Sequence, residues 1–85
     1  MIRPVNVAFT ILIKIEGRLK EFNFRKRNEN LYDVNTNDEY TARYYFQMER
    51  EDGKNEWRIS GQPLPVWLTG HETAISNALN HKIQT

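Results

Sequence analysis

Cysteine is absent from this chain of 85 residues. A disulfide framework and thiolate metal sites are therefore excluded, and a cytoplasmic location is the simplest expectation. No apolar run approaches the roughly 18–20 residues that a membrane-spanning helix requires, so we expect no membrane association. Residues 1–6 also lack the apolar stretch and the small-residue cleavage site of a signal peptide. These absences together predict a soluble protein.

A strong excess of charge of either sign is also missing. Twelve Lys and Arg stand against eleven Asp and Glu, which gives a formal net charge of +1, whereas a dedicated nucleic-acid-binding protein is usually strongly basic. Electrostatic binding must therefore depend on where the charges lie. The four glycines are too scattered to cradle a phosphate. The length allows one core, so we expect residues 1–85 to form a single domain.

Alternation of apolar and polar residues is the strongest pattern present. A period of two indicates strands with one buried face. The pattern predicts four strands, at residues 5–15, 21–25, 40–49 and 56–60. Gly17 and the Asp52-Gly53 pair mark two reversals, because tight hairpin turns need positive φ. The four strands are therefore expected to form two consecutive antiparallel hairpins.

Between the second and third strands, residues 28–38 are rich in Asn and Asp. Such side chains stabilise turns through hydrogen bonds to the nearby backbone, so we predict a loop. Leu31, Tyr32 and Val34 interrupt the polarity, and part of the segment could extend the second strand or pack beneath the sheet.

The same segment contains the first three ligand positions of a calcium loop, Asp33-x-Asn35-x-Asn37. The rest of that motif is missing, because Asp38 stands where the sharp turn requires glycine and Tyr44 where a bidentate glutamate is needed. We therefore predict no calcium site.

Beyond Gly61 the period changes. Pro63 and Pro65 cannot donate ladder hydrogen bonds, and apolar residues then recur at three- and four-residue spacing. This spacing predicts an amphipathic helix that begins at Pro65, or after a Thr69 cap, and ends near Lys82. Only this helix can cover the apolar face of the sheet. The expected fold is α+β: a four-stranded antiparallel β-meander with one C-terminal α-helix packed on one face (ββββα).

Residues for catalysis or metal binding do not cluster in the sequence. His71-Glu72 begins like a zinc-protease helix, but Ile75 replaces the second histidine, and His81 lies about 15 Å further along an ideal helix. Neither serine has the context of an activated nucleophile, and the chain has no thiol. We therefore predict no enzyme activity, no catalytic residues, no cofactor and no metal site.

The sheet face opposite the helix is the most informative predicted surface. If Phe22, Phe46 and Trp57 point to the core, alternation places basic residues and one tyrosine on the other face. These residues are Lys14, Arg25, Arg27, Arg43, Tyr45 and Arg58. Cations can contact phosphates and a tyrosine ring can stack on a base, which is the chemistry of sequence-tolerant binding to single-stranded DNA or RNA. We predict phosphate contacts for the five cations and stacking for Tyr45.

A second class of function stays open. Glu21, Glu49 and Glu56 share the parity of the arginines and could neutralise them in an ordinary solvated face. Leu12 is expected on the same open face, where an exposed apolar group suggests a protein partner or a homodimer. The alternative is therefore a protein-protein interaction or regulatory domain that could self-associate.

The predicted ββββα order resembles the repeat unit of purine-rich-element-binding proteins and the single-strand-binding domain of certain transcriptional coactivators. The resemblance is one of topology, and many unrelated domains share this order. It implies basic and aromatic residues on the sheet face away from the helix. The residues that correspond in character are Arg25, Arg43, Tyr45 and Arg58.

Overall fold

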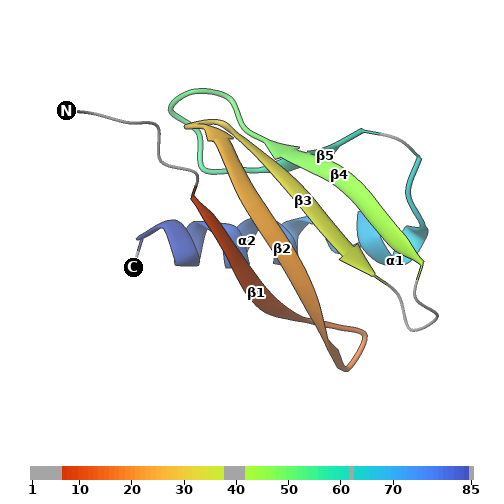
Figure 1. The fold of residues 1–85 in the computed structure, drawn as a ribbon. Helices are drawn as coiled ribbons and strands as arrows, with labels where there is room; N and C mark the ends of the chain where they lie inside the picture. Colours follow the sequence, from red (N-terminus) through yellow and green to blue (C-terminus); the bar gives the residue numbers. More distant parts are fainter. Residues whose placement is uncertain (1–6, 38–41, 62, 85) are drawn as a thin grey trace.

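A computed structural model describes residues 7–37, 42–61 and 63–84. It has one antiparallel sheet in the meander order β1-β2-β3-β4-β5, followed by two helices (Figure 1). The strands are β1 Ala8–Ile15, β2 Arg18–Asn28, β3 Leu31–Asn37, β4 Arg43–Glu49 and β5 Arg58–Ser60. The helices are α1 Val66–Thr69 and α2 Glu72–Gln84. The predicted α+β fold, an antiparallel meander with a C-terminal helix, is confirmed.

The prediction of a loop at 28–38 is wrong, because most of this segment forms the central strand β3. Tyr32, Val34 and Thr36 are buried on the helix side, and the polar residues between them point to the other face. Asn and Asp are tolerated there because side chains on neighbouring strands form hydrogen bonds with them. Asx-turn chemistry does occur at the start of the segment, where the Asn30 amide donates to Asn28 Oδ1 at 2.8 Å.

The β1–β2 reversal is a two-residue hairpin turn. Ile15 pairs with Arg18, and the two residues between them have positive φ, 51° for Glu16 and 82° for Gly17. This is the type I′ geometry that matches the twist of the flanking strands. Glycine adopts it without steric cost, whereas a glutamate does not.

Glu16→Asn should therefore stabilise the protein. Asparagine tolerates the left-handed conformation, and the substitution should recover about 0.5–1 kcal/mol of the roughly 1–2 kcal/mol that this conformation costs an ordinary residue. Urea denaturation measures the change in the free energy of unfolding. Glu16→Gln is the control, because it removes the same charge without favouring positive φ; an equal gain in both variants would contradict this explanation.

The hydrophobic core lies between the sheet and the helices. Figure 1 shows both helices on the same side of the sheet, with α2 running behind the strands toward β1. Fully buried side chains come from every layer, including Phe22 of β2, Met48 of β4, Leu68 of α1 and Leu79 of α2. The opposite face of the sheet has no helix over it in the described part of the chain, so it is the open face predicted from the sequence.

The C-terminal region forms two helices in place of the single predicted one. Pro65 is the N-cap of α1, and Gly70 ends that helix after one turn. The Glu72 carboxylate does not close a capping box on Thr69 but accepts the Ile59 amide at 2.9 Å. Trp67 of α1 is half-buried, and its ring meets the Tyr44 ring edge-on with centroids 5.9 Å apart.

Side chains of α2 bind the backbone of the segment that leads into and forms β5. Besides the Glu72 contact, Ser76 Oγ accepts the Trp57 amide at 3.0 Å, and Asn80 Nδ2 donates to the Asn55 carbonyl at 2.5 Å. Glu72, Ser76 and Asn80 are four residues apart and therefore lie on one face of the helix. The helix thus supplies, along the outer edge of β5, hydrogen bonds that a further strand would otherwise supply.

Neither described helix is both long enough and apolar enough to cross a bilayer.

Candidate functional site

Strand register brings open-face residues into rows that cross the sheet. One row contains Asn23, Asn35 and Tyr45, from β2, β3 and β4. The next contains Arg25, Asp33 and Gln47 from the same strands. Neighbouring strands are about 4.8 Å apart, so each row places its side chains within mutual reach.

A chain of hydrogen bonds crosses four strands, beginning along the first row and ending at Arg43 of the adjacent row. The Thr10 hydroxyl donates to Asn23 Oδ1 at 2.7 Å, and Asn23 Nδ2 donates to Asn35 Oδ1 at 3.0 Å. The Arg43 guanidinium donates to the same Asn35 oxygen at 2.5 Å. Each side chain is oriented by the next, and within the described residues the partner of Arg43 is an uncharged amide.

The second row is centred on the carboxylate of Asp33. Gln47 Nε2 donates to one of its oxygens at 2.9 Å, and the Arg27 guanidinium pairs with the other. Arg27 reaches this position because the β2–β3 register shifts between Lys26 and Asn28, leaving it as the extra residue of a bulge. The pKa of Asp33 is held below its ordinary value, first by the Gln47 hydrogen bond and then by Arg27, while partial burial acts in the opposite direction.

Gln47→Leu should raise the pKa of Asp33 toward the ordinary value of about 3.9. Because the native pKa is depressed, the Asp33 contribution to stability is present above the unfolded-state pKa and is lost as pH falls through the native pKa. The variant should therefore lose less stability on acidification than the wild type. An NMR titration of the side-chain carboxyl carbons reports the pKa. Glu49→Gln, which removes a carboxylate that does not contact Asp33, should leave it unchanged.

Tyr45, Arg25 and Arg43 are the predicted binding residues that the structure brings together on the open face. The Tyr45 side chain is 64% exposed. Arg25 and Arg43 are exposed and form no ion pair within the described residues. Arg43 lies two residues before Tyr45 on β4, whereas Arg25 lies two strands away on β2, in the row on the other side of Tyr45.

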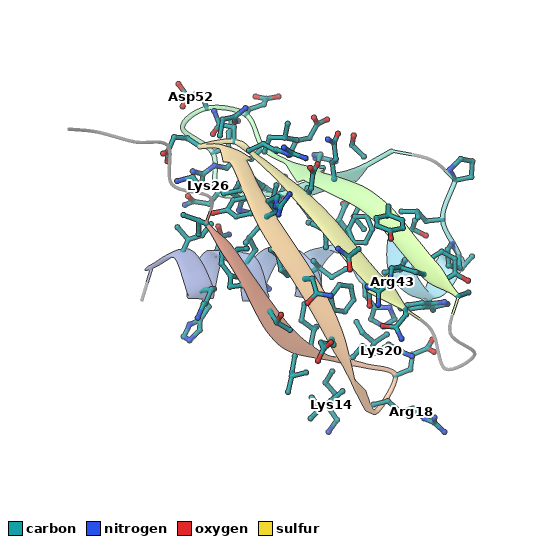
Figure 2. All side chains as sticks on the ribbon, in the orientation of Figure 1. Lys14, Arg18, Lys20, Lys26, Arg43 and Asp52 are labelled. Atoms are coloured by element: carbon teal, nitrogen blue, oxygen red, sulfur yellow. The ribbon has the colours of Figure 1, made fainter. Side chains whose placement is uncertain are left out.

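The other three predicted residues are placed differently. Arg27 is paired with Asp33, and Arg58 makes an ion pair with Glu56 at 3.3 Å. Lys14 is exposed but lies near the β1–β2 turn, at the end of the sheet where Figure 2 also places Arg18. Arg27 and Arg58 therefore each have a carboxylate partner, and Lys14 is at the margin of the open face.

The centre of the open face is a shallow depression of about 630 Å³. Its polar lining includes Asn23, Arg25, Arg27, Asp33, Asn35, Tyr45 and Gln47. The depression thus combines an exposed aromatic ring, guanidinium groups and several amides that can both donate and accept hydrogen bonds. We define these seven residues together with Arg43 as the open-face site.

Asp33, Asn35, Asn23 and Gln47 were not predicted as part of this site. The first two were assigned to a loop, and without β3 nothing placed them beside β2 and β4. The signal was present, because Tyr32, Val34 and Thr36 alternate with polar residues at strand period. The side-chain amide of Gln47 could have been assigned from its parity with Tyr45.

The described ranges were also compared with the requirements of a metal site. These residues contain no group of three His, Cys, Asp or Glu side chains that could hold a metal ion. His71 Nδ1 lies 2.8 Å from the Trp67 carbonyl oxygen, one helical turn earlier, and so has a local partner.

Comparison with known protein families, with curated proteins and with solved structures found no match to this chain. The fifth strand also departs from the four-stranded order on which the topological resemblance to purine-rich-element-binding repeats was based. The fold and the open-face site therefore define the class of molecule: a small α+β fold whose sheet has one polar and partly basic face that no helix covers within the described residues.

Proposed function

We propose that this protein is a noncatalytic binding module that takes single-stranded nucleic acid on the open face of its sheet. One observation carries the proposal: the exposed Tyr45 ring shares the open face with Arg43 of the same strand and Arg25 of β2. Neither arginine forms an ion pair among the described residues, although Arg25 lies opposite Asp33 and interacts with it electrostatically. A base can stack on the ring while the guanidinium groups contact the phosphates on either side.

The surrounding side chains support the same function. Asn35 fixes the direction of Arg43, and Arg27 neutralises Asp33, which reduces the repulsion that this carboxylate would exert on a phosphate. The amides of Asn23 and Gln47 offer donors and acceptors of the kind that bases carry on their edges. We assign phosphate contact to Arg25 and Arg43 and stacking to Tyr45. A cytoplasmic location, for which the absence of cysteine is the support, belongs to this proposal.

Fluorescence anisotropy with labelled mixed-sequence single-stranded DNA and RNA tests the proposal. Tyr45→Ala should weaken binding by about 1–3 kcal/mol, which is fivefold or more in affinity, whereas Tyr45→Phe should keep most of it because the ring remains. Arg25→Ala and Arg43→Ala should each lower the slope of log affinity against log salt by about 0.7, the value for one phosphate on a single strand.

The matched control is Lys54→Ala, which removes an exposed cation in the turn between β4 and β5. It should change neither the affinity nor the salt slope. Absence of binding at low salt, or equal binding by wild type and Tyr45→Ala, would reject the open-face site as a nucleic-acid surface. The second candidate function is binding to a protein partner. A different part of the sheet, the edge of β1, supports it.

A further inference from the structure

The two edges of the sheet are treated differently by the fold. Along the outer edge of β5, the amides of Trp57 and Ile59 donate to Ser76 and Glu72 of α2. Contacts with a helix protect a sheet edge of this kind against pairing with another chain. No equivalent cover lies along β1 within the described residues, although α2 passes beneath its inner face.

The free edge of β1 presents the backbone groups of its even-numbered residues. The Lys26 amide donates to the Val7 carbonyl at 2.8 Å, and Ile15 pairs with Arg18 across the two-residue turn. Odd-numbered residues therefore bond to β2, and the N–H and C=O groups of Thr10, Leu12 and Lys14 point away from the sheet. No hydrogen bond to these groups occurs within the described part of the chain.

The side chains along this edge are unusually apolar for an unprotected strand. β1 has eight residues, and Lys14 is its only charged one, whereas natural edge strands are commonly short, charged or interrupted by proline. Leu12 is 60% exposed on the open face. On the inner face Phe9 and Ile11 are only partly buried. Both faces thus have apolar surface at the edge that a second strand would cover.

We propose that two copies of this chain pair antiparallel through β1, with Leu12 at the two-fold axis, to form one continuous ten-stranded sheet. In this register Leu12 lies opposite Leu12 of the second copy, and Ile11 lies opposite Ile13. The outward-pointing backbone groups of both copies then meet in hydrogen-bonded pairs, as an antiparallel ladder requires.

The polar side chains of β1 fit the same register. Lys14 of the second copy lies opposite Thr10, and the two lysines are kept apart because each faces a threonine. The Thr10 hydroxyl already donates its hydrogen to Asn23, so its oxygen lone pairs remain to accept from the ammonium group. The hydrogen-bond chain that runs from Thr10 to Arg43 is thereby continued into the second copy.

The C-terminal turn of α2 adds a contact on the other face. Figure 1 shows this end of the helix projecting past β1, and Ile83 within it is 40% exposed. This turn lies on the side of β1 where the second copy pairs, so its exposed apolar surface adds to that of the edge. The proposal stands on the β1 edge alone and does not depend on nucleic-acid binding.

Sedimentation equilibrium on the full chain tests the proposal. Over about a hundredfold range of concentration the mass should rise from 10.1 kDa toward twice that value. Leu12→Lys places two like charges at the axis and should weaken association at least about tenfold. Leu19→Lys is the matched control, because Leu19 is 67% exposed on β2 but does not lie on the edge; it should still dimerise.

A cysteine variant tests the register independently of charge. The chain has no cysteine, so Leu12→Cys introduces a single thiol. Cα atoms of a hydrogen-bonded antiparallel pair are about 5.5 Å apart, within the range that a disulfide spans. Mild oxidation should cross-link Leu12→Cys and leave Leu19→Cys largely monomeric. A wild type that stays at 10.1 kDa at every concentration, or equal effects at both leucines in either experiment, would overturn the proposal.

Discussion

Replacing Trp57 by alanine should cost about 3–5 kcal/mol of unfolding free energy, the largest loss we expect from any single substitution outside the turns. The side chain has no exposed surface. The Trp57 ring meets the Tyr32 ring edge-on, with centroids 5.3 Å apart. The Arg50 guanidinium lies over the Trp57 ring, 4.6 Å from the ring centroid. Its Nε1 donates to Asn80 Oδ1 at 2.8 Å. Removal therefore leaves a cavity and breaks a link to α2.

A loss of this size is a large fraction of the stability expected for a chain of 85 residues, which is about 4–13 kcal/mol at the usual value per residue. Urea denaturation followed by far-UV circular dichroism measures it without relying on Trp57 fluorescence. Trp67→Ala is the comparison, because Trp67 is only half-buried and should cost less. Trp57→Phe should also cost less, since a ring remains in the core. A greater loss at Trp67 than at Trp57 would contradict this account of the core.

Removing the hydroxyl of Ser76 should produce the second large effect. Ser76 is buried, and its Oγ accepts the Trp57 amide. In Ser76→Ala that amide has no partner, which costs about 1–3 kcal/mol, and the higher helix propensity of alanine returns only about 0.5 kcal/mol. The free energy of unfolding and the exchange rate of the Trp57 amide should both report the change.

Ser60→Ala provides the control for Ser76→Ala. Ser60 lies in β5 and is partly buried, and within the described residues its hydroxyl has no hydrogen bond. Its removal should change the unfolding free energy by no more than about 0.5 kcal/mol. Equal effects of the two substitutions would show that the Ser76 contact contributes no more than an ordinary surface hydroxyl.

The strands that the sequence predicted correctly are those in which alternation continues over many residues. In β1 the apolar positions repeat without interruption, and in β4 Tyr44, Phe46 and Met48 mark the buried side. β3 was missed because Asn and Asp, which are typical of turns, dominate its outward positions and conceal the alternation of Tyr32, Val34 and Thr36. A central strand can carry such residues when strands on both sides supply hydrogen bonds, and those partners are set by the tertiary structure.

The faces of the sheet followed from parity, and so the sequence placed Arg25, Arg43 and Tyr45 on a common surface. The contacts between side chains could not be predicted from parity. The pairing of Arg27 with Asp33 depends on a bulge in β2 and on the β2–β3 register, and neither is encoded in a local pattern. Which cations form ion pairs with the described carboxylates therefore required the structure.

The contacts between α2 and the β5 segment also bear on the order in which the chain folds. The hydrogen bonds of Ile59, Trp57 and Asn55 to the helix join residues 13, 19 and 25 positions apart, whereas β1 and β2 meet through a two-residue turn. Short loops close faster than long ones, so the N-terminal hairpin can form early. A strand of three residues such as β5 gains little from pairing with β4 before the helix arrives. The last strand and the helix should therefore become ordered together, as one cooperative closing step.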